Sequence, residues 1–237
     1  MEYSKAFVRI WVLVQCGVSS ATGLFCFLLR KWEQKTYIGR FLLPLSDGWK
    51  ELSMMNLRCV ILPENPDELY EALYRRAMPD RKQRADRYLR KADGLRCLAA
   101  GELLRETVER ELNLTEFTVV TDPDGKPRIA GQDHFHYNLS HSGNRVAMAW
   151  GDSPVGVDVQ HMHMDAGKEQ LARRFFTCEE QEYIFEQPQL IQARFYRVWT
   201  GKESYLKYLG TGLTKSLSSL HWATDAASGS ASIAANV

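Results

Sequence analysis

Residues 136–160, HYNLSHSGNRVAMAWGDSPVGVDVQ, carry most of the information about the fold. Short β-prone runs occupy 136–139, 145–150 and 154–159. A polar corner follows the first run, and a Gly-Asp-Ser-Pro turn precedes the third. Three short strands so close together predict a meander or a set of hairpins.

The flanking sequence adds helices on both sides of these strands. Apolar spacing and end signals predict further strands at 57–62 and 118–121, and helices at 66–78, 81–112 (one long helix or a broken pair), 169–176 and 192–209. Thr177, followed by two glutamates, is typical of a helix N-cap. The order is strand–helix–helix–strands, then strand–helix–helix, and the Ser- and Ala-rich tail from about 216 is expected to be irregular.

Composition places the chain among ordinary globular proteins. It has 237 residues, 45% apolar and 25% charged, with a formal net charge of +1. That balance gives no overall field for nucleic acid, and the Arg-rich stretch lacks interleaved aromatic stacking positions. The five cysteines are odd in number and form no CxxC pair, which argues against a disulfide framework or a zinc site and for a reducing compartment.

Residues 10–29 contain no formal charge and are long enough to cross a bilayer or to belong to a signal peptide. Several polar residues and glycines dilute this stretch. We expect the first 55 residues to be an upstream extension outside the domain, with a membrane anchor as the alternative.

Two predicted strands carry side chains that could bind a metal or a phosphate. Ser140 and His141 lie at the end of a predicted strand, where a histidine binds phosphate or acts as a base, unless the segment is only a hydrogen-bonded turn. Asp158 and Gln160 share one face of the next strand because side chains alternate. Two such oxygen ligands suit Mg²⁺.

Helical positions supply the remaining candidates. Trp199, Glu203 and Lys207 are four residues apart and share one helix face, although a surface Glu–Lys pair explains the spacing equally well. The arginines between Arg81 and Arg96 lie off the apolar side of their helix, as in a solvated face.

Taken together and in this order, the segments resemble the signature of the 4′-phosphopantetheinyl transferase superfamily. The matching pieces are Asn138–Ser142, Gly156–Gln160, Trp199–Lys207 with Gly210–Leu213, Gly125–Pro127, and Phe175–Glu180. The match runs over about residues 56–213. Several short motifs in one order are specific, although each alone is weak.

The resemblance implies an enzyme that moves phosphopantetheine from coenzyme A to a serine of an apo acyl or peptidyl carrier protein with Mg²⁺. It implies metal ligation by Asp158, Gln160 and Glu203. It implies coenzyme A binding by Arg81, Arg84, Arg96, Lys126, Ser140, His141 and Lys207. It implies catalytic roles for Glu203, Lys207 and His141, with either Glu203 or a metal-bound water as the base.

The resemblance also implies an α+β fold of the large two-half type, a pseudodimer with its site in the cleft between the halves. The halves would be 56–153 and 154–237, in a cytoplasmic monomer without a membrane or nucleic-acid partner. Gln160 stands where many relatives have Glu, and the second half is expected to be incomplete at its C-terminus. The alternative function is therefore a shortened relative that binds coenzyme A or carrier protein without catalysis.

Overall fold

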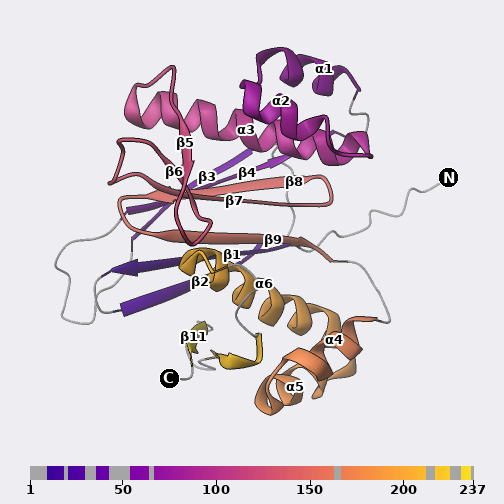
Figure 1. Ribbon diagram of the computed structural model, residues 1–237. Helices are drawn as coiled ribbons and strands as arrows, with labels where there is room; N and C mark the ends of the chain where they lie inside the picture. Colours follow the sequence, from indigo (N-terminus) through magenta and orange to yellow (C-terminus); the bar gives the residue numbers. More distant parts are fainter. Residues whose placement is uncertain are drawn as a thin grey trace.

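The computed structural model describes residues 10–18, 21–29, 36–42, 54–63, 67–162, 167–211, 217–224 and 231–235 (Figure 1). Its strands are β1 Ile10–Val18, β2 Ala21–Leu29, β3 Thr36–Leu42, β4 Met54–Ile61, β5 Val119–Thr121, β6 Pro127–Ile129, β7 His136–Ser142, β8 Arg145–Gly151, β9 Val155–His161, β10 Leu220–Thr224 and β11 Ala231–Ala235. Its helices are α1 Asp67–Arg76, α2 Pro79–Ala85, α3 Lys91–Leu112, α4 Gly167–Phe175, α5 Cys178–Phe185 and α6 Ile191–Leu209. The α+β class is confirmed.

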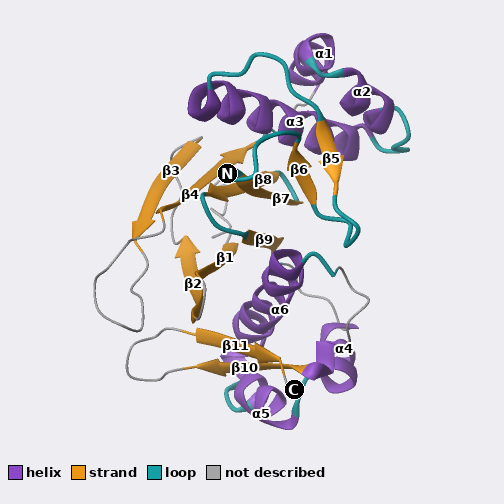
Figure 2. Ribbon diagram, turned by 60° about the vertical axis from the view of Figure 1, so that its left-hand side comes forward, coloured by secondary structure: helices purple, strands orange, loops and turns teal. Residues whose placement is uncertain are grey.

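Two sheets form the framework (Figure 2). One has four strands in the order β3-β4-β8-β7, and the other has five in the order β10-β11-β2-β1-β9. The three predicted strands are present as β7, β8 and β9. β7 and β8 pair in the four-stranded sheet, whereas β9 belongs to the five-stranded sheet. Because β7 and β9 nevertheless lie side by side, the two sheets meet along these strands.

Helices α1, α2 and α3 cover one face of the four-stranded sheet (Figure 1). The buried core between them includes Leu98 and Val108 of α3 and Met148 and Trp150 of β8. The sequence allowed one long helix or a broken pair over 81–112, and the structure contains the broken pair, α2 and α3. Helix α3 ends where Asn113 adopts a left-handed conformation with φ of 55°.

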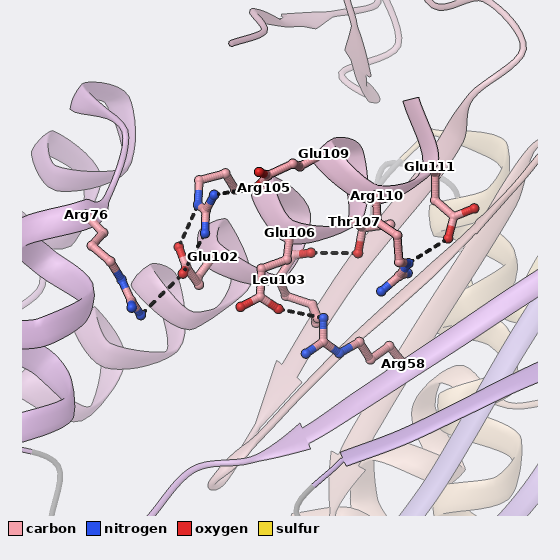
Figure 3. Close-up of polar contacts among 10 residues, drawn as sticks. All are labelled: Arg58, Arg76, Glu102, Leu103, Arg105, Glu106, Thr107, Glu109, Arg110 and Glu111. Carbon is pink, nitrogen blue, oxygen red and sulfur yellow. Dashed lines mark hydrogen bonds and ion pairs between the residues drawn. The ribbon is translucent and has the colours of Figure 1, made fainter. Parts of the chain in front are cut away.

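Ion pairs line the polar side of α3 (Figure 3). Arg105 bonds Glu102 and Glu109 on successive turns, and Arg76 of α1 reaches Glu102. Arg58 of β4 donates to Glu106 at 2.7 Å, which connects the helix to the sheet below it. These glutamates neutralise part of the arginine-rich charge on this side of the molecule.

Helix α6 packs beneath β9, with α4 and α5 around its N-terminal part (Figures 1 and 2). The predicted cap at Thr177 is confirmed as a capping box, since Thr177 and Glu180 each accept a hydrogen bond from the other's backbone N–H. Glu180 also pairs with Lys202 of α6 at 2.5 Å, and both side chains are fully buried. This ion pair holds α5 against α6.

The N-terminal segment differs from the expectation of an extension outside the domain. Strand β1 pairs antiparallel with β9 along Ile10–Cys16, and β3 pairs with β4. A physical reason lies in β9, whose Val155, Val157 and Val159 are buried, so its backbone needs a partner on that edge. Residues 10–29, considered above as a membrane segment, form two strands, and no helix in the described ranges is long and apolar enough to cross a membrane.

The C-terminal tail also differs from the irregular structure expected of it. Strands β10 and β11 pair with each other, and β11 contacts β2 through Ala231 and Leu24. The small residues of this tail gave no periodic apolar pattern, but they are compatible with strand pairing, which uses backbone groups. Strands from both ends of the chain therefore join β9, which lies at one edge, in the five-stranded sheet.

Candidate functional site

The polar cluster of the molecule lies where β7, β9 and α6 meet. Lys207 of α6 donates to Asp158 of β9 at 2.6 Å, and Gln160 donates its side-chain N–H to the other Asp158 oxygen at 2.9 Å. Asp158 is only 2% exposed. The predicted face of Asp158 and Gln160 is therefore confirmed as polar, and Lys207 pairs across elements with Asp158 rather than along its own helix with Glu203.

Ser140 completes the centre of this cluster. Its hydroxyl donates to Asp158 at 2.9 Å and accepts from the Lys207 ammonium at 2.9 Å and from the Val159 N–H at 3.2 Å. A hydroxyl has one donor and two acceptor positions, so all three are occupied. Ser140 thereby fixes the relative positions of Asp158 and Lys207.

Gly156 explains how α6 comes so close to β9. A Cβ atom at this position would lie 2.1 Å from the Ser204 carbonyl oxygen and 2.4 Å from the Tyr208 nitrogen. The helix backbone therefore packs directly on the strand at Gly156, which lies two residues before Asp158 and on the same face of β9. Only glycine permits this approach, which brings Lys207 within reach of Asp158.

Glu203 lies beside the cluster with a perturbed carboxyl group. Burial raises its pKa, nearby Asp158 raises it further, and Lys207 acts in the opposite direction. Among the residues that the structure describes, no hydrogen bond or ion pair engages the Glu203 carboxylate. It is the available acid of the site and therefore suits a base or a metal ligand.

Basic side chains adjoin the acids on the β7 side. Burial lowers the pKa of His141, and the neighbouring Arg96 and Lys207 lower it further, which favours the neutral imidazole. Arg96 of α3 donates to the Gly143 carbonyl oxygen at 2.8 Å and pairs with Asp93. Three predicted anion-binding residues, Arg96, His141 and Lys207, are thus brought together.

The donor set fits a hard divalent cation only with help from water or substrate. No group of three His, Cys, Asp or Glu residues suited to a metal occurs within the described ranges. Two carboxylates, Asp158 and Glu203, face one ammonium, Lys207, which leaves surplus negative charge. Gln160 adds a neutral amide oxygen, and Mg²⁺ commonly completes its shell with waters and phosphate oxygens. The residues therefore fit Mg²⁺.

Lys126, a predicted nucleotide ligand, makes hydrogen bonds within the protein. Its ammonium donates to the carbonyl oxygens of Val155 at 3.0 Å and Tyr208 at 2.7 Å. It also lies over the Tyr208 ring. The turn that carries Lys126 is thereby attached to the C-terminal end of α6, where carbonyl groups lack helical partners.

The two arginines of α2 lie apart from the acids. The stem of Arg81 packs on α3, since a Cβ at Gly101 would lie 2.9 Å from its Cγ. Arg81 is also close enough to the buried Tyr137 hydroxyl to influence its pKa, which burial raises to about 12. Arg84 is exposed. No contact recorded in the described part of the chain joins either arginine to Asp158 or Lys207.

Some structural partners were not predicted from the motifs. Lys202, next to Glu203, is buried with Glu180 and also donates to the Leu217 carbonyl oxygen at 2.8 Å. Lysine is rarely buried in proteins, so there was no reason in the sequence to expect a buried Lys202 next to Glu203. Trp199 stacks on Phe195 in the core, so it supports the helix rather than the polar cluster.

Comparison with known proteins places this site in a family. The model of the 4′-phosphopantetheinyl transferase superfamily matches residues 154–234, which include β9 and α6. The 4′-phosphopantetheinyl transferase psf-1 of Bacillus pumilus is 32% identical over 59% of this chain and 60% of its own length. The 4′-phosphopantetheinyl transferase Sfp of Bacillus subtilis (strain 168) is 31% identical over 60% of this chain and 63% of its own length.

The match to these two relatives covers less than two thirds of either one. A third relative, the 4′-phosphopantetheinyl transferase HetI of Nostoc sp. (strain PCC 7120), is 30% identical over 64% of this chain and 67% of its own length. The chain belongs to the 4′-phosphopantetheinyl transferase superfamily.

Proposed function

We propose that this protein transfers 4′-phosphopantetheine from coenzyme A to a serine of an apo acyl or peptidyl carrier protein. The observation that carries the proposal is the cluster in which Asp158 and Glu203 adjoin Lys207, His141 and Arg96. Acids beside hydrogen-bond donors suit a metal-bound diphosphate, because the acids hold the metal while the Lys207 and Arg96 cations and the neutral His141 imidazole donate to phosphate oxygens. Family membership supports the same reaction.

In the proposed reaction the carrier's serine oxygen attacks the phosphorus on the pantetheine side of the coenzyme A diphosphate. The new P–O bond joins phosphopantetheine to the serine, and the bond to the other phosphate breaks, releasing 3′,5′-ADP. Glu203 takes the serine proton directly or through a water, since its raised pKa makes it a better base than an ordinary carboxylate. Lys207 stabilises the charge that develops on the phosphates.

Mg²⁺ would be held by Asp158, Glu203 and the amide oxygen of Gln160. When bound, the ion supplies charge neutralisation for the diphosphate. The hydrogen bond that Gln160 donates to Asp158 employs its nitrogen, which leaves its oxygen as the atom for a ligand. Replacement of a carboxylate by this amide removes one negative charge from the ligand set but keeps an oxygen.

The remaining proposed ligands surround this centre. Arg96 and His141 would contact the phosphates, and Ser140 would position Lys207 against them. Arg81 and Arg84 on α2 would take the adenine and 3′-phosphate end, where forked guanidinium donors suit phosphate. Because Arg96 and His141 precede residue 153 while Asp158 and Lys207 follow it, the proposed site draws on both halves of a pseudodimeric enzyme. We expect that enzyme to be a cytoplasmic monomer.

A labelling experiment tests the proposal. Apo carrier proteins of the fatty-acid, polyketide and nonribosomal-peptide classes are incubated with the full chain, Mg²⁺ and coenzyme A that bears a fluorophore on its thiol. We expect a fluorescent carrier band that EDTA abolishes and that a carrier lacking the acceptor serine does not give. Coenzyme A binding by the folded protein without any labelled carrier would contradict the proposal and favour a binding protein.

The position of Lys126 gives a separate prediction about its role. Lys126→Met removes two charge-assisted hydrogen bonds to Val155 and Tyr208, so we expect a loss of roughly 2 kcal/mol in the free energy of unfolding. The KM for coenzyme A should change less than it does in Arg96→Met. Thermal unfolding and KM are measured for both variants. Unchanged stability with a large rise in KM would instead assign Lys126 to the nucleotide.

A further inference from the structure

Three side chains of β7 replace a missing backbone ladder between β7 and β9. Asn138 Oδ1 accepts from the Val157 N–H at 2.9 Å, and Ser140 Oγ accepts from the Val159 N–H at 3.2 Å. Ser142 Oγ accepts from the N–H of His161 at 3.0 Å. Each pair is 19 residues apart in sequence, so alternate residues of β7 follow alternate residues of β9 along two parallel strands.

These hydrogen bonds satisfy groups that would otherwise be buried without partners. β7 forms its backbone pairs with β8, and β9 forms its backbone pairs with β1. The N–H groups of Val157 and Val159 face β7 instead, and both residues are 0% exposed. A buried N–H without an acceptor carries the full cost of its lost hydration. The motif residues at 138, 140 and 142 thus act as substitute carbonyls.

The same contacts determine which way β9 faces. With Val157, Val159 and His161 directing their N–H groups at β7, the side chains of Asp158 and Gln160 lie on the face toward α6. A shift of one residue would turn Asp158 away from Lys207, because strand side chains alternate. Ser140 belongs both to this row and to the polar cluster. Asn138 and Ser142 belong only to the row, since their recorded hydrogen bonds go to β9 backbone.

We propose that Asn138 and Ser142 are positioning residues of the site, setting the register of β9 so that Asp158 and Gln160 face Lys207 and Glu203. The proposal rests on the transferase activity proposed above. Neither residue contacts the reacting atoms, and each acts through a backbone N–H of β9. Removing an acceptor should loosen β9 at one end of the row, and so lower kcat and the affinity for Mg²⁺ while leaving KM for coenzyme A nearly unchanged.

The test compares Asn138→Ala, Ser142→Ala and Ser142→Thr in the full chain with a control of similar stability loss, Val108→Ala, in the core beneath α3. Amide hydrogen exchange of Val157 and His161 is the direct readout. We expect exchange about tenfold faster at Val157 in Asn138→Ala and at His161 in Ser142→Ala, the change for about one lost hydrogen bond. Ser142→Thr keeps an acceptor oxygen and should retain protection. Val108→Ala should lower the melting temperature without a selective effect at these amides.

Activity and metal binding complete the test. We expect Asn138→Ala and Ser142→Ala to lower kcat and the calorimetric affinity for Mg²⁺, Ser142→Thr to restore both, and Val108→Ala to keep both at assay temperature. Wild-type kcat and Mg²⁺ affinity in the two alanine variants would overturn the proposal. If Asn138→Ala does not fold, the Ser142 pair decides alone. Failure of the proposed function would appear differently, as no transfer by the wild-type protein.

Discussion

Glu203→Gln is expected to lower the transfer rate by at least about 100-fold and to raise the melting temperature. The carboxylate is needed to hold the metal or to accept the serine proton, and an amide does neither well. Stability changes in the opposite sense because burial and Asp158 disfavour the charged form of Glu203, as its raised pKa records. Initial rates at saturating coenzyme A and thermal unfolding measure the two effects.

The pH dependence of that stability difference follows from the direction of the pKa shift. A carboxyl group whose pKa is higher in the folded state contributes most stability below its unfolded pKa. That contribution is lost as the pH rises through the folded pKa. The gain from Glu203→Gln should therefore grow as the pH rises from about 4, the ordinary pKa of a glutamate, through the raised pKa of the folded state. Glu182→Gln, an exposed change on α5, is the matched control and should alter neither rate nor stability. A wild-type rate in Glu203→Gln would contradict the assignment.

Gly156→Ala, which adds a single methyl group, is expected to lower both the stability of the protein and its transfer rate strongly. The added Cβ would lie 2.1 Å from the Ser204 carbonyl oxygen and 2.4 Å from the Tyr208 nitrogen. Both of these neighbours are backbone atoms, so no side-chain rotation relieves the overlap. Helix α6 must move away from β9, which separates Lys207 from Asp158. We expect a loss of about 3 kcal/mol or more in the free energy of unfolding. Displacement by about 1 Å should also lower the transfer rate by about 100-fold.

Gly101→Ala provides the comparison for this prediction. It also adds a methyl group at a close contact, but the atoms it meets belong to the flexible side chain of Arg81. Alanine also favours the helical conformation of α3. Its loss of stability should therefore be much smaller than that of Gly156→Ala. Urea unfolding of both variants decides the point, and equal stability of Gly156→Ala and the wild type would show that α6 does not rest on β9.

Most elements with strong local signals could be predicted from the sequence. The helix at Ile191–Leu209 has a clear apolar face and ends at Gly210, where a left-handed φ of 79° requires glycine. The helix N-cap at Thr177 was equally predictable, and the structure adds the reciprocal hydrogen bond of a capping box. The strands within residues 10–29 and after 216 were not. β1 pairs with β9 and β11 pairs with β2 across long separations in sequence, and this pairing uses backbone groups.

The sequence predicted which residues form the candidate site better than it predicted which of them pair with one another. Asp158 and Gln160 on one face of a strand follow from alternation alone, and the structure joins them to Lys207. Lys207 pairs with Asp158 instead of Glu203 because α6 packs closely on β9 at Gly156. The spacing of residues in the sequence does not predict this packing. The motif predicts Lys126 as a nucleotide ligand but does not predict the hydrogen bonds that it donates to backbone carbonyls of β9 and α6.

The most direct test of the central claim is the intact mass of an apo carrier protein after incubation with this chain, coenzyme A and Mg²⁺. We expect a gain equal to one phosphopantetheine, absent with EDTA and absent with Asp158→Ala or Glu203→Gln. No gain with several carriers, using protein shown to be folded, would contradict the claim that Asp158, Glu203 and Lys207 form a working transferase site.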